Sequence, residues 1–135
     1  MISILIVTHF SLGDSYRQIM KHFFGDSVPE TFVIGSNTLD TQDSLLPKIQ
    51  QVIERIPEDQ PILILTDIFG ATPCNVLNYI EASRSISVIA GINICMLVKA
   101  VQDANKYDDV AEFAQEVVKT AKKGIITYSL NKSPT

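Results

Sequence analysis

Apolar runs typical of buried strands alternate along this chain with stretches of helical periodicity. The first run begins at Met1 and leads to His9, and three others cover residues 31–34, 62–67 and 86–90. The first and third runs are almost continuously apolar, as expected for strands that are buried on both faces of a parallel sheet. The pattern therefore predicts a sheet whose central strands include these two runs.

Between the runs, apolar residues recur at helical spacing. Helices are predicted around residues 16–24, 45–56, 72–77 and 93–101, and from Asp108 to just before Gly124. Gly25 is expected to terminate the first helix, and Pro47 to lie in or near the first turn of the second. Thr72 and Asn93 are expected as N-caps, with Pro73 at the first helical position.

Strands that alternate with helices favour right-handed βαβ crossovers and a doubly wound α/β fold. Residues 125–130 predict a last strand at a half-exposed edge, because polar and apolar residues alternate there. Such an edge can pair with a second chain, which favours a dimer. We expect one domain over residues 1–130 and a disordered tail over residues 131–135.

Composition narrows the class of protein. The chain has 135 residues, of which 46% are hydrophobic, and a net charge of −4. This size supports one core, and the acidic balance indicates neither a nucleic-acid-binding protein nor one that binds anionic membranes. The amino terminus lacks the basic and long apolar segments of a signal peptide, so we expect a cytoplasmic protein.

Cysteine and histidine spacing gives no sign of a metal site. Cys74 and Cys95 fall in predicted helices without a CxxC spacing and are expected to be buried free thiols. His22 shares no metal-ligand spacing with His9 and is expected at the surface. Arg17, on the same predicted helix, is expected to be solvated. We expect neither a metal nor another cofactor.

The candidate chemistry lies at the ends of the first and third strands, which both finish in Thr plus one ionisable residue: His9 and Asp67. In open parallel sheets, binding sites collect at the carboxyl ends of the strands, where the strand order reverses. Neighbouring strands there would bring the two side chains together. Either residue alone could be structural, since a lone His is often a hydrogen-bonded core residue and an Asp often stabilises a turn.

A carboxylate that accepts the N–H of one imidazole nitrogen orients the ring and leaves the other nitrogen free to attack. The helix start at Thr72 and the N–H groups around residues 10–13 are expected to donate toward the same crevice and to favour an anion such as phosphate. The chain has no P-loop and no acidic metal cluster. These features predict a histidine that carries a phosphoryl group received from another phosphoprotein.

Three motifs carry a resemblance to a known family: Val7-Thr8-His9, the stretch from Leu65 to Asn75, and the stretch from Ala90 to Val98. Together they resemble the enzyme IIA component of the mannose family of the bacterial phosphoenolpyruvate-dependent sugar phosphotransferase system. The likeness covers essentially the whole chain.

The resemblance implies that His9 accepts a phosphoryl group from phosphorylated HPr and passes it to a IIB component. Asp67 would orient the ring, and Thr72 and Phe10 would lie near the phosphate. It also implies a flavodoxin-like sheet of order 2-1-3-4 and a homodimer that exchanges its last strands. Membrane IIC and IID components would be reached only through IIB.

Two residues depart from the pattern of this family. Phe10 follows the histidine where many members have glycine, and Cys95 replaces a common proline. Glycine permits backbone geometries that Phe resists, so the first departure bears on the loop and on the surface offered to partners.

Two other functions fit parts of the sequence. One is a regulatory protein whose phosphorylation state is sensed by a partner without any sugar being moved. The other is a signalling receiver domain phosphorylated on Asp67, although a receiver requires an acidic cluster after its first strand, where this chain has Thr8 and His9.

Overall fold

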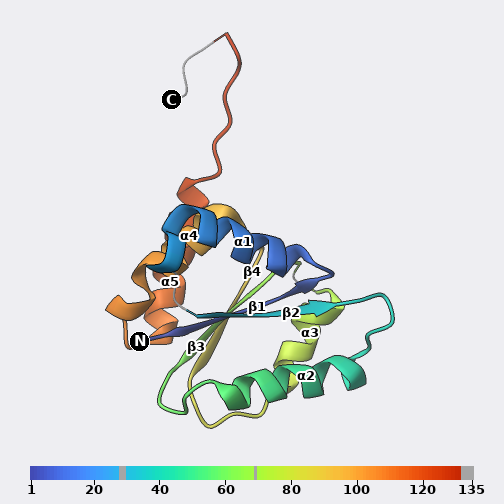
Figure 1. The fold of residues 1–135 in the computed structure, drawn as a ribbon. Helices are drawn as coiled ribbons and strands as arrows, with labels where there is room; N and C mark the ends of the chain where they lie inside the picture. The colour runs from blue at the N-terminus through green and yellow to red at the C-terminus, as the bar shows by residue number, and fades with distance from the viewer. Residues whose placement is uncertain (28–29, 69, 132–135) are drawn as a thin grey trace.

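A parallel β-sheet between two layers of helices forms the centre of the computed structural model, which describes residues 1–27, 30–68 and 70–131 (Figure 1). In these residues the strands are β1 (Ser3–His9), β2 (Thr31–Ser36), β3 (Ile62–Thr66) and β4 (Ile86–Ala90). Their order is β2-β1-β3-β4, and every adjacent pair is parallel. The expected flavodoxin-like order is thereby confirmed.

The helices cover the two faces of the sheet unequally (Figure 1). One face carries α1 (Leu12–Phe24), α4 (Ile94–Asp103) and α5 (Val110–Lys123), and the other carries α2 (Gln42–Arg55) and α3 (Thr72–Val76). Short 3₁₀ turns follow α1, α3 and α4 at residues 25–27, 77–79 and 104–106.

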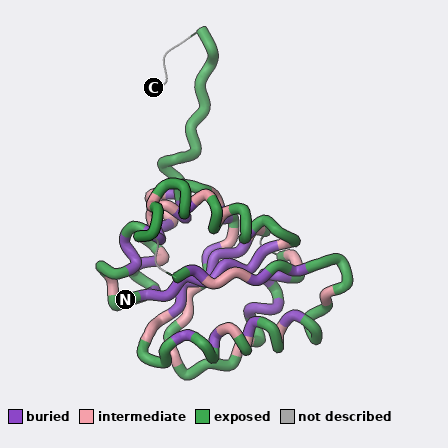
Figure 2. The backbone as a smooth tube through the Cα atoms, viewed as in Figure 1, coloured by how far each residue is buried: buried purple, intermediate pink, exposed green. Residues whose placement is uncertain are grey.

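The two central strands are buried on both faces, which explains their continuously apolar sequence (Figure 2). Along β1, Ile4 and Ile6 pack with α1, α4 and α5, while Leu5 and Val7 pack with α2. The same alternation divides β3 between the two clusters. Because successive side chains of a strand point to opposite faces, one sheet serves two apolar cores.

Helix ends follow the predicted signals with some corrections. Gly25 ends α1 with a φ of 60°, and the Asn93 side chain caps α4 by accepting the Met96 N–H at 2.9 Å. The N-cap of α3 is Ala71 rather than Thr72, which occupies the first helical position. Thr72 lies inside the helix because the chain is still extended at Ala71, where ψ is 167°.

Helix α2 also starts earlier than the predicted residue 45. Thr41 is its N-cap, so the helix begins at Gln42 and Pro47 lies beyond the first turn. A proline there removes one helical hydrogen bond, which the burial of Leu45 and Ile49 on the inner side of the helix compensates. The apolar stripe of α1 is mostly packed as expected, but its Phe23 is exposed.

The predicted final strand is wrong for the single chain. Residues 125–130 form no strand in the structure, and this segment extends away from the rest of the molecule (Figure 1). Its apolar residues are exposed: Ile125, Ile126, Tyr128 and Leu130. A strand exists only with a pairing partner, and the segment pairs with no strand among the residues that the structure describes. Of the expected tail, Asn131 is exposed and residues 132–135 lie outside the described residues.

The two cysteines are both free, but only one is buried. Cys74 is covered in α3, as expected, whereas Cys95 is exposed in the first turn of α4. The thiol of Cys95 lies close to Gly124, at the start of the extended segment. Across the described ranges, none of the helices combines the length and apolar character needed to cross a membrane.

Candidate functional site

The sheet brings His9 and Asp67 into direct contact. Strands β1 and β3 are neighbours, and their register pairs Val7 with Thr66. The carboxyl ends of the two strands therefore lie side by side at the same edge of the sheet. The His9 Nδ1 atom lies 2.9 Å from Oδ2 of Asp67. The predicted pairing of these residues across the carboxyl edge of the sheet is therefore present.

Asp67 is the better buried partner. Its side chain is 10% exposed and that of His9 is 37% exposed. Burial alone would raise the pKa of Asp67, but hydrogen bonds from the backbone and ring of His9 and from the Ile68 N–H outweigh it, so the pKa lies below its ordinary value. The group is therefore a carboxylate at neutral pH.

This contact assigns the tautomer of a neutral His9 ring. A carboxylate can only accept, so Nδ1 carries the proton and donates it to Asp67. The lone pair is then on Nε2, at the other side of a ring that remains partly open to solvent. The site therefore offers an oriented nitrogen nucleophile on a partly exposed ring.

Phe10, the residue after His9, has a backbone conformation that is rare for phenylalanine. Its φ is 49°, in the left-handed region, and its ring centroid lies 6.3 Å from that of His9. The Phe10 N–H donates to the Ser36 carbonyl oxygen at 2.7 Å. Phe10 therefore keeps a backbone geometry that glycine, the common residue of the family at this position, adopts without strain.

The loop N–H groups do not all face the crevice, contrary to expectation. The N–H of Phe10 is taken by Ser36, and the N–H of Gly13 donates to Oγ1 of the buried Thr8 at 3.0 Å. Buried backbone donors require partners, and here the protein supplies them itself. These two donors are not available to an anion.

Backbone hydrogen bonds tie β4 to the site. The N–H of Gly91 donates to the Asp67 carbonyl at 2.8 Å, and the N–H of Ile92 to that of Thr66 at 3.1 Å. The positive φ of Gly91, 88°, makes this sharp turn possible without strain. Together with its side-chain bonds, this fixes Asp67 from both sides.

Thr72 is exposed at the first residue of α3, a helix that packs against β1. Nearby, the Asn75 amide donates to the Gly70 carbonyl at 2.8 Å and closes the loop between β3 and α3. Phe69, in the same motif, lies outside the described residues. Arg17 is exposed and forms an ion pair with Asp14, and His22 is exposed as predicted.

Two residues near the site were not singled out from the sequence. Burial raises the pKa of Tyr16, and the nearby Asp67 carboxylate raises it further. The helical periodicity places Tyr16 in the apolar stripe of α1, and its hydroxyl is the single sequence feature that indicates a polar neighbour. Thr66, directly before Asp67, is fully buried and its hydroxyl has no hydrogen-bond partner. The sequence feature that could have indicated it is its position next to Asp67 at the end of the third apolar run.

A search of the described ranges finds no cluster of three or more His, Cys, Asp or Glu side chains placed to hold a metal ion. The chemistry of the described site is that of imidazole, carboxylate and hydroxyl groups.

Comparison with known proteins identifies the family. The family model for the PTS system fructose IIA component, EIIA-man, matches residues 3–124. The chain belongs to this family. It is 28% identical over 105 residues to the fructose-specific EIIA component of Bacillus subtilis, a match that covers 75% of this chain and 69% of the relative.

Longer relatives and solved structures agree with this result. The mannose-specific EIIAB component of Escherichia coli K12 is 25% identical over 128 residues, which are 92% of this chain but 38% of the relative. The crystal structure of phosphotransferase system component EIIA from Streptococcus agalactiae is 25% identical, with a TM-score of 0.83 over 94% of this chain and 97% of that one. The chain therefore corresponds to an EIIA unit.

Proposed function

We propose that this EIIA protein carries a phosphoryl group on Nε2 of His9 during sugar uptake. The observation that carries the proposal is the contact of 2.9 Å between Nδ1 of His9 and Oδ2 of Asp67, because it leaves Nε2 with the lone pair. The partial exposure of the ring allows a partner protein to reach that atom.

The transfer requires little machinery. The Nε2 lone pair attacks the phosphorus of a phosphohistidine on the donor, and the donor P–N bond breaks with its electron pair on the donor nitrogen. The His9 ring becomes positively charged while Nδ1 keeps its proton, and the Asp67 carboxylate stabilises that charge. The reverse sequence of bond changes passes the group to an acceptor.

We assign supporting roles to the neighbouring residues. Asp67 orients and stabilises the ring and is not itself the phosphoryl acceptor, because its oxygens already accept from His9 and Ile68. This argues against the receiver-domain alternative. Thr72, exposed at the start of α3, would donate its hydroxyl to a phosphoryl oxygen.

The partners belong to the same proposal. Phosphorylated HPr would be the donor and a IIB component the acceptor, so that the membrane IIC and IID components are reached only through IIB. We propose a cytoplasmic homodimer in which residues 125–130 of each copy pair with the other, since these residues expose four large apolar side chains and form no strand within the described part of the chain.

The test is incubation with phosphoenolpyruvate, enzyme I and HPr, followed by intact-mass measurement. One added phosphoryl group is expected, stable to base and labile to acid. The mass gain should disappear in His9→Ala and persist in His22→Ala, a matched control because the chain has two histidines. Unchanged labelling of His9→Ala, or loss of the group in base as expected for an acyl phosphate, would contradict the assignment. Transfer onward to purified IIB proteins would separate transport from a purely regulatory role.

A further inference from the structure

Among the described residues, Phe10 is the one residue other than glycine whose φ is positive. L-residues other than Gly, Asn and Asp seldom adopt the left-handed region, and such strain persists where the surrounding structure imposes it. Its position directly after His9 places this strained residue at the proposed phosphorylation site.

Contacts on both sides of Phe10 hold its backbone. Its N–H donates to the Ser36 carbonyl at 2.7 Å, next to the register pair of His9 with Ser36. Its carbonyl lies against Gly35, where an added Cβ would come within 2.2 Å of the Phe10 oxygen. The end of β2 therefore holds the Phe10 backbone, and with it the position of the Phe10 Cβ atom.

The fixed backbone places an aromatic ring next to the imidazole. The centroids of the two rings are 6.3 Å apart with an interplanar angle of 51°, within the range of aromatic contacts. Asp67 contacts the Nδ1 side of the imidazole, and the Phe10 ring lies beside the same imidazole, whose side chain is 37% exposed. Phe10 itself is 56% exposed, so its position does not arise from core packing.

We propose that Phe10 is a shielding residue, whose ring keeps water away from a phosphoryl group on His9 and so lengthens the lifetime of the phosphorylated protein. The inference rests on the proposed phosphorylation of His9. A carrier must hold a reactive P–N bond until its acceptor arrives, and an apolar surface beside the bond reduces the access of water.

The competing reaction is hydrolysis. The oxygen of a water molecule attacks phosphorus, the P–Nε2 bond breaks, and its electron pair returns to Nε2. Both water protons leave with the product as dihydrogen phosphate, and His9 returns to its neutral form. Removing the ring opens one approach to phosphorus and should accelerate this step.

The test uses full-length protein phosphorylated by phosphoramidate, a small donor that requires no partner docking. After removal of the reagent, intact mass follows the loss of the phosphoryl group at neutral pH. Phe10→Gly and Phe10→Asn remove the ring and tolerate a positive φ, so both should stay folded. Phe10→Tyr is the matched control that keeps an aromatic ring.

We expect the Gly and Asn variants to lose the group several-fold faster than the parent protein, and the Tyr variant to match the parent. Thermal unfolding of each variant checks that the fold is kept. Equal rates in all four proteins would overturn the proposal. Slower transfer from phosphorylated HPr with unchanged hydrolysis would also overturn it, because the ring would then serve docking alone.

The failure of the proposed function has a different signature. If neither phosphoramidate nor phosphorylated HPr labels the parent protein on His9, the carrier role fails, and the shielding role fails with it. If labelling occurs on His9 and the hydrolysis rates are equal, only the shielding role fails.

Discussion

The carboxylate of Asp67 accepts three hydrogen bonds: two from His9, through its backbone and its ring, and one from the Ile68 N–H. This makes it both the orienting group of the imidazole and a link between the ends of β1 and β3. Removing its charge should therefore affect chemistry more than folding.

For Asp67→Asn we expect His9 phosphorylation to slow by about 10- to 100-fold, because an amide can present its N–H to Nδ1 and favour the wrong tautomer. The fold should be retained, since an amide keeps the size of the side chain. Single-turnover transfer from phosphorylated HPr measures the rate, and circular dichroism checks the fold. An unchanged rate would contradict the orienting role.

Asp103 gives a pH-dependent prediction away from the site. It is buried, and it binds Lys99 at 2.5 Å and Lys106 at 3.0 Å. The hydrogen bond from Lys99 lowers the pKa of Asp103, and that from Lys106 adds to the effect against the opposing influence of burial. Asp103→Asn should lower the free energy of unfolding at pH 7 by about 2 kcal/mol.

The sign of the pH effect follows from the lowered pKa. The unfolded chain takes up the proton first, near the ordinary Asp pKa of about 3.9, so the stabilisation is complete above that pH and is lost as pH falls through the folded-state pKa. Urea unfolding from pH 7 to pH 3 should show the stability gap between parent and Asp103→Asn closing below about pH 4. A gap that stays constant would contradict this assignment.

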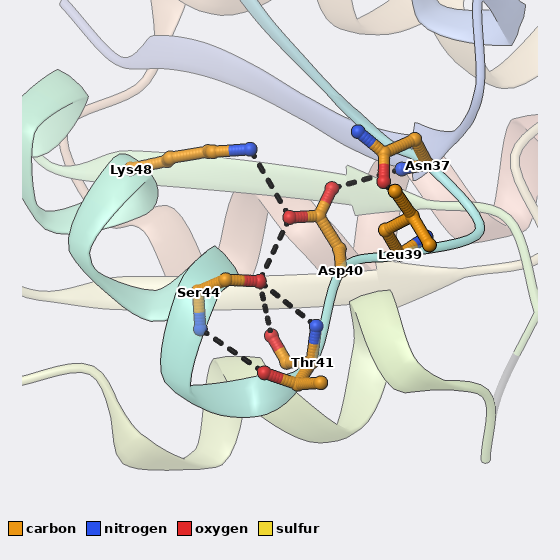
Figure 3. A network of polar contacts seen from close by, with 6 residues as sticks. All are labelled: Asn37, Leu39, Asp40, Thr41, Ser44 and Lys48. Atoms are coloured by element: carbon orange, nitrogen blue, oxygen red, sulfur yellow. Dashed lines mark hydrogen bonds and ion pairs between the residues drawn. The ribbon is translucent and has the colours of Figure 1, made fainter.

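At the scale of elements, the loop between β2 and α2 is held by a polar network (Figure 3). Asp40 accepts from the Asn37 N–H at 2.9 Å, the Ser44 hydroxyl at 2.8 Å and Lys48 at 3.1 Å. Thr41 and Ser44 form a reciprocal capping box at the start of α2. The network fixes the chain just beyond Ser36, whose carbonyl holds Phe10.

Thr41→Ala should lower the free energy of unfolding by about 1 kcal/mol, because the Ser44 N–H loses its acceptor at the helix start. Thr38→Ala, an exposed threonine of the same loop, is the matched control and should change stability by less than about 0.5 kcal/mol. Urea unfolding at pH 7 measures both. Equal effects would mean that the cap is not the source.

Gly35→Ala tests the close approach of β2 to Phe10. A methyl group there would lie 2.2 Å from the Phe10 carbonyl oxygen, so the backbone must shift. We expect a loss of about 1–3 kcal/mol of stability. Because the shift displaces the Phe10 ring, hydrolysis of phosphorylated His9 should also accelerate. If the variant kept the stability of the parent, the approach of Gly35 to the Phe10 carbonyl would not restrict the residue at position 35.

At the scale of the whole molecule, the exposed apolar segment 125–130 lies outside a chain whose two cores are otherwise complete. Deleting residues 125–135 should therefore leave a folded protein with nearly unchanged thermal stability per chain, while the proposed dimer is lost. Sedimentation equilibrium of the parent and the truncated chain measures the mass. A truncated protein that is still dimeric would place the interface elsewhere.

Much of this architecture was readable from local pattern. Continuous apolar runs predicted β1 and β3 because strands buried on both faces need no polar side, and Asn93 predicted a helix start because its side chain replaces a missing hydrogen bond. His9 and Asp67 stood out as ionisable residues at the ends of such runs. Their pairing followed from the rule that parallel strands end at one edge.

Other features depend on contacts between segments distant in the chain. The left-handed backbone of Phe10 accompanies the hydrogen bond to Ser36 and the packing against Gly35, and Cys95 is exposed although it lies in a predicted helix. The N-cap position of Ala71, and the lack of a strand at residues 125–130 in the described part of the chain, likewise depend on neighbours. The sequence alone determined the order of the main elements and the candidate pair His9 and Asp67, because apolar periodicity and capping signals are local. Tertiary structure decided the hydrogen-bond partners and the exposure of each residue, because these depend on how distant segments pack.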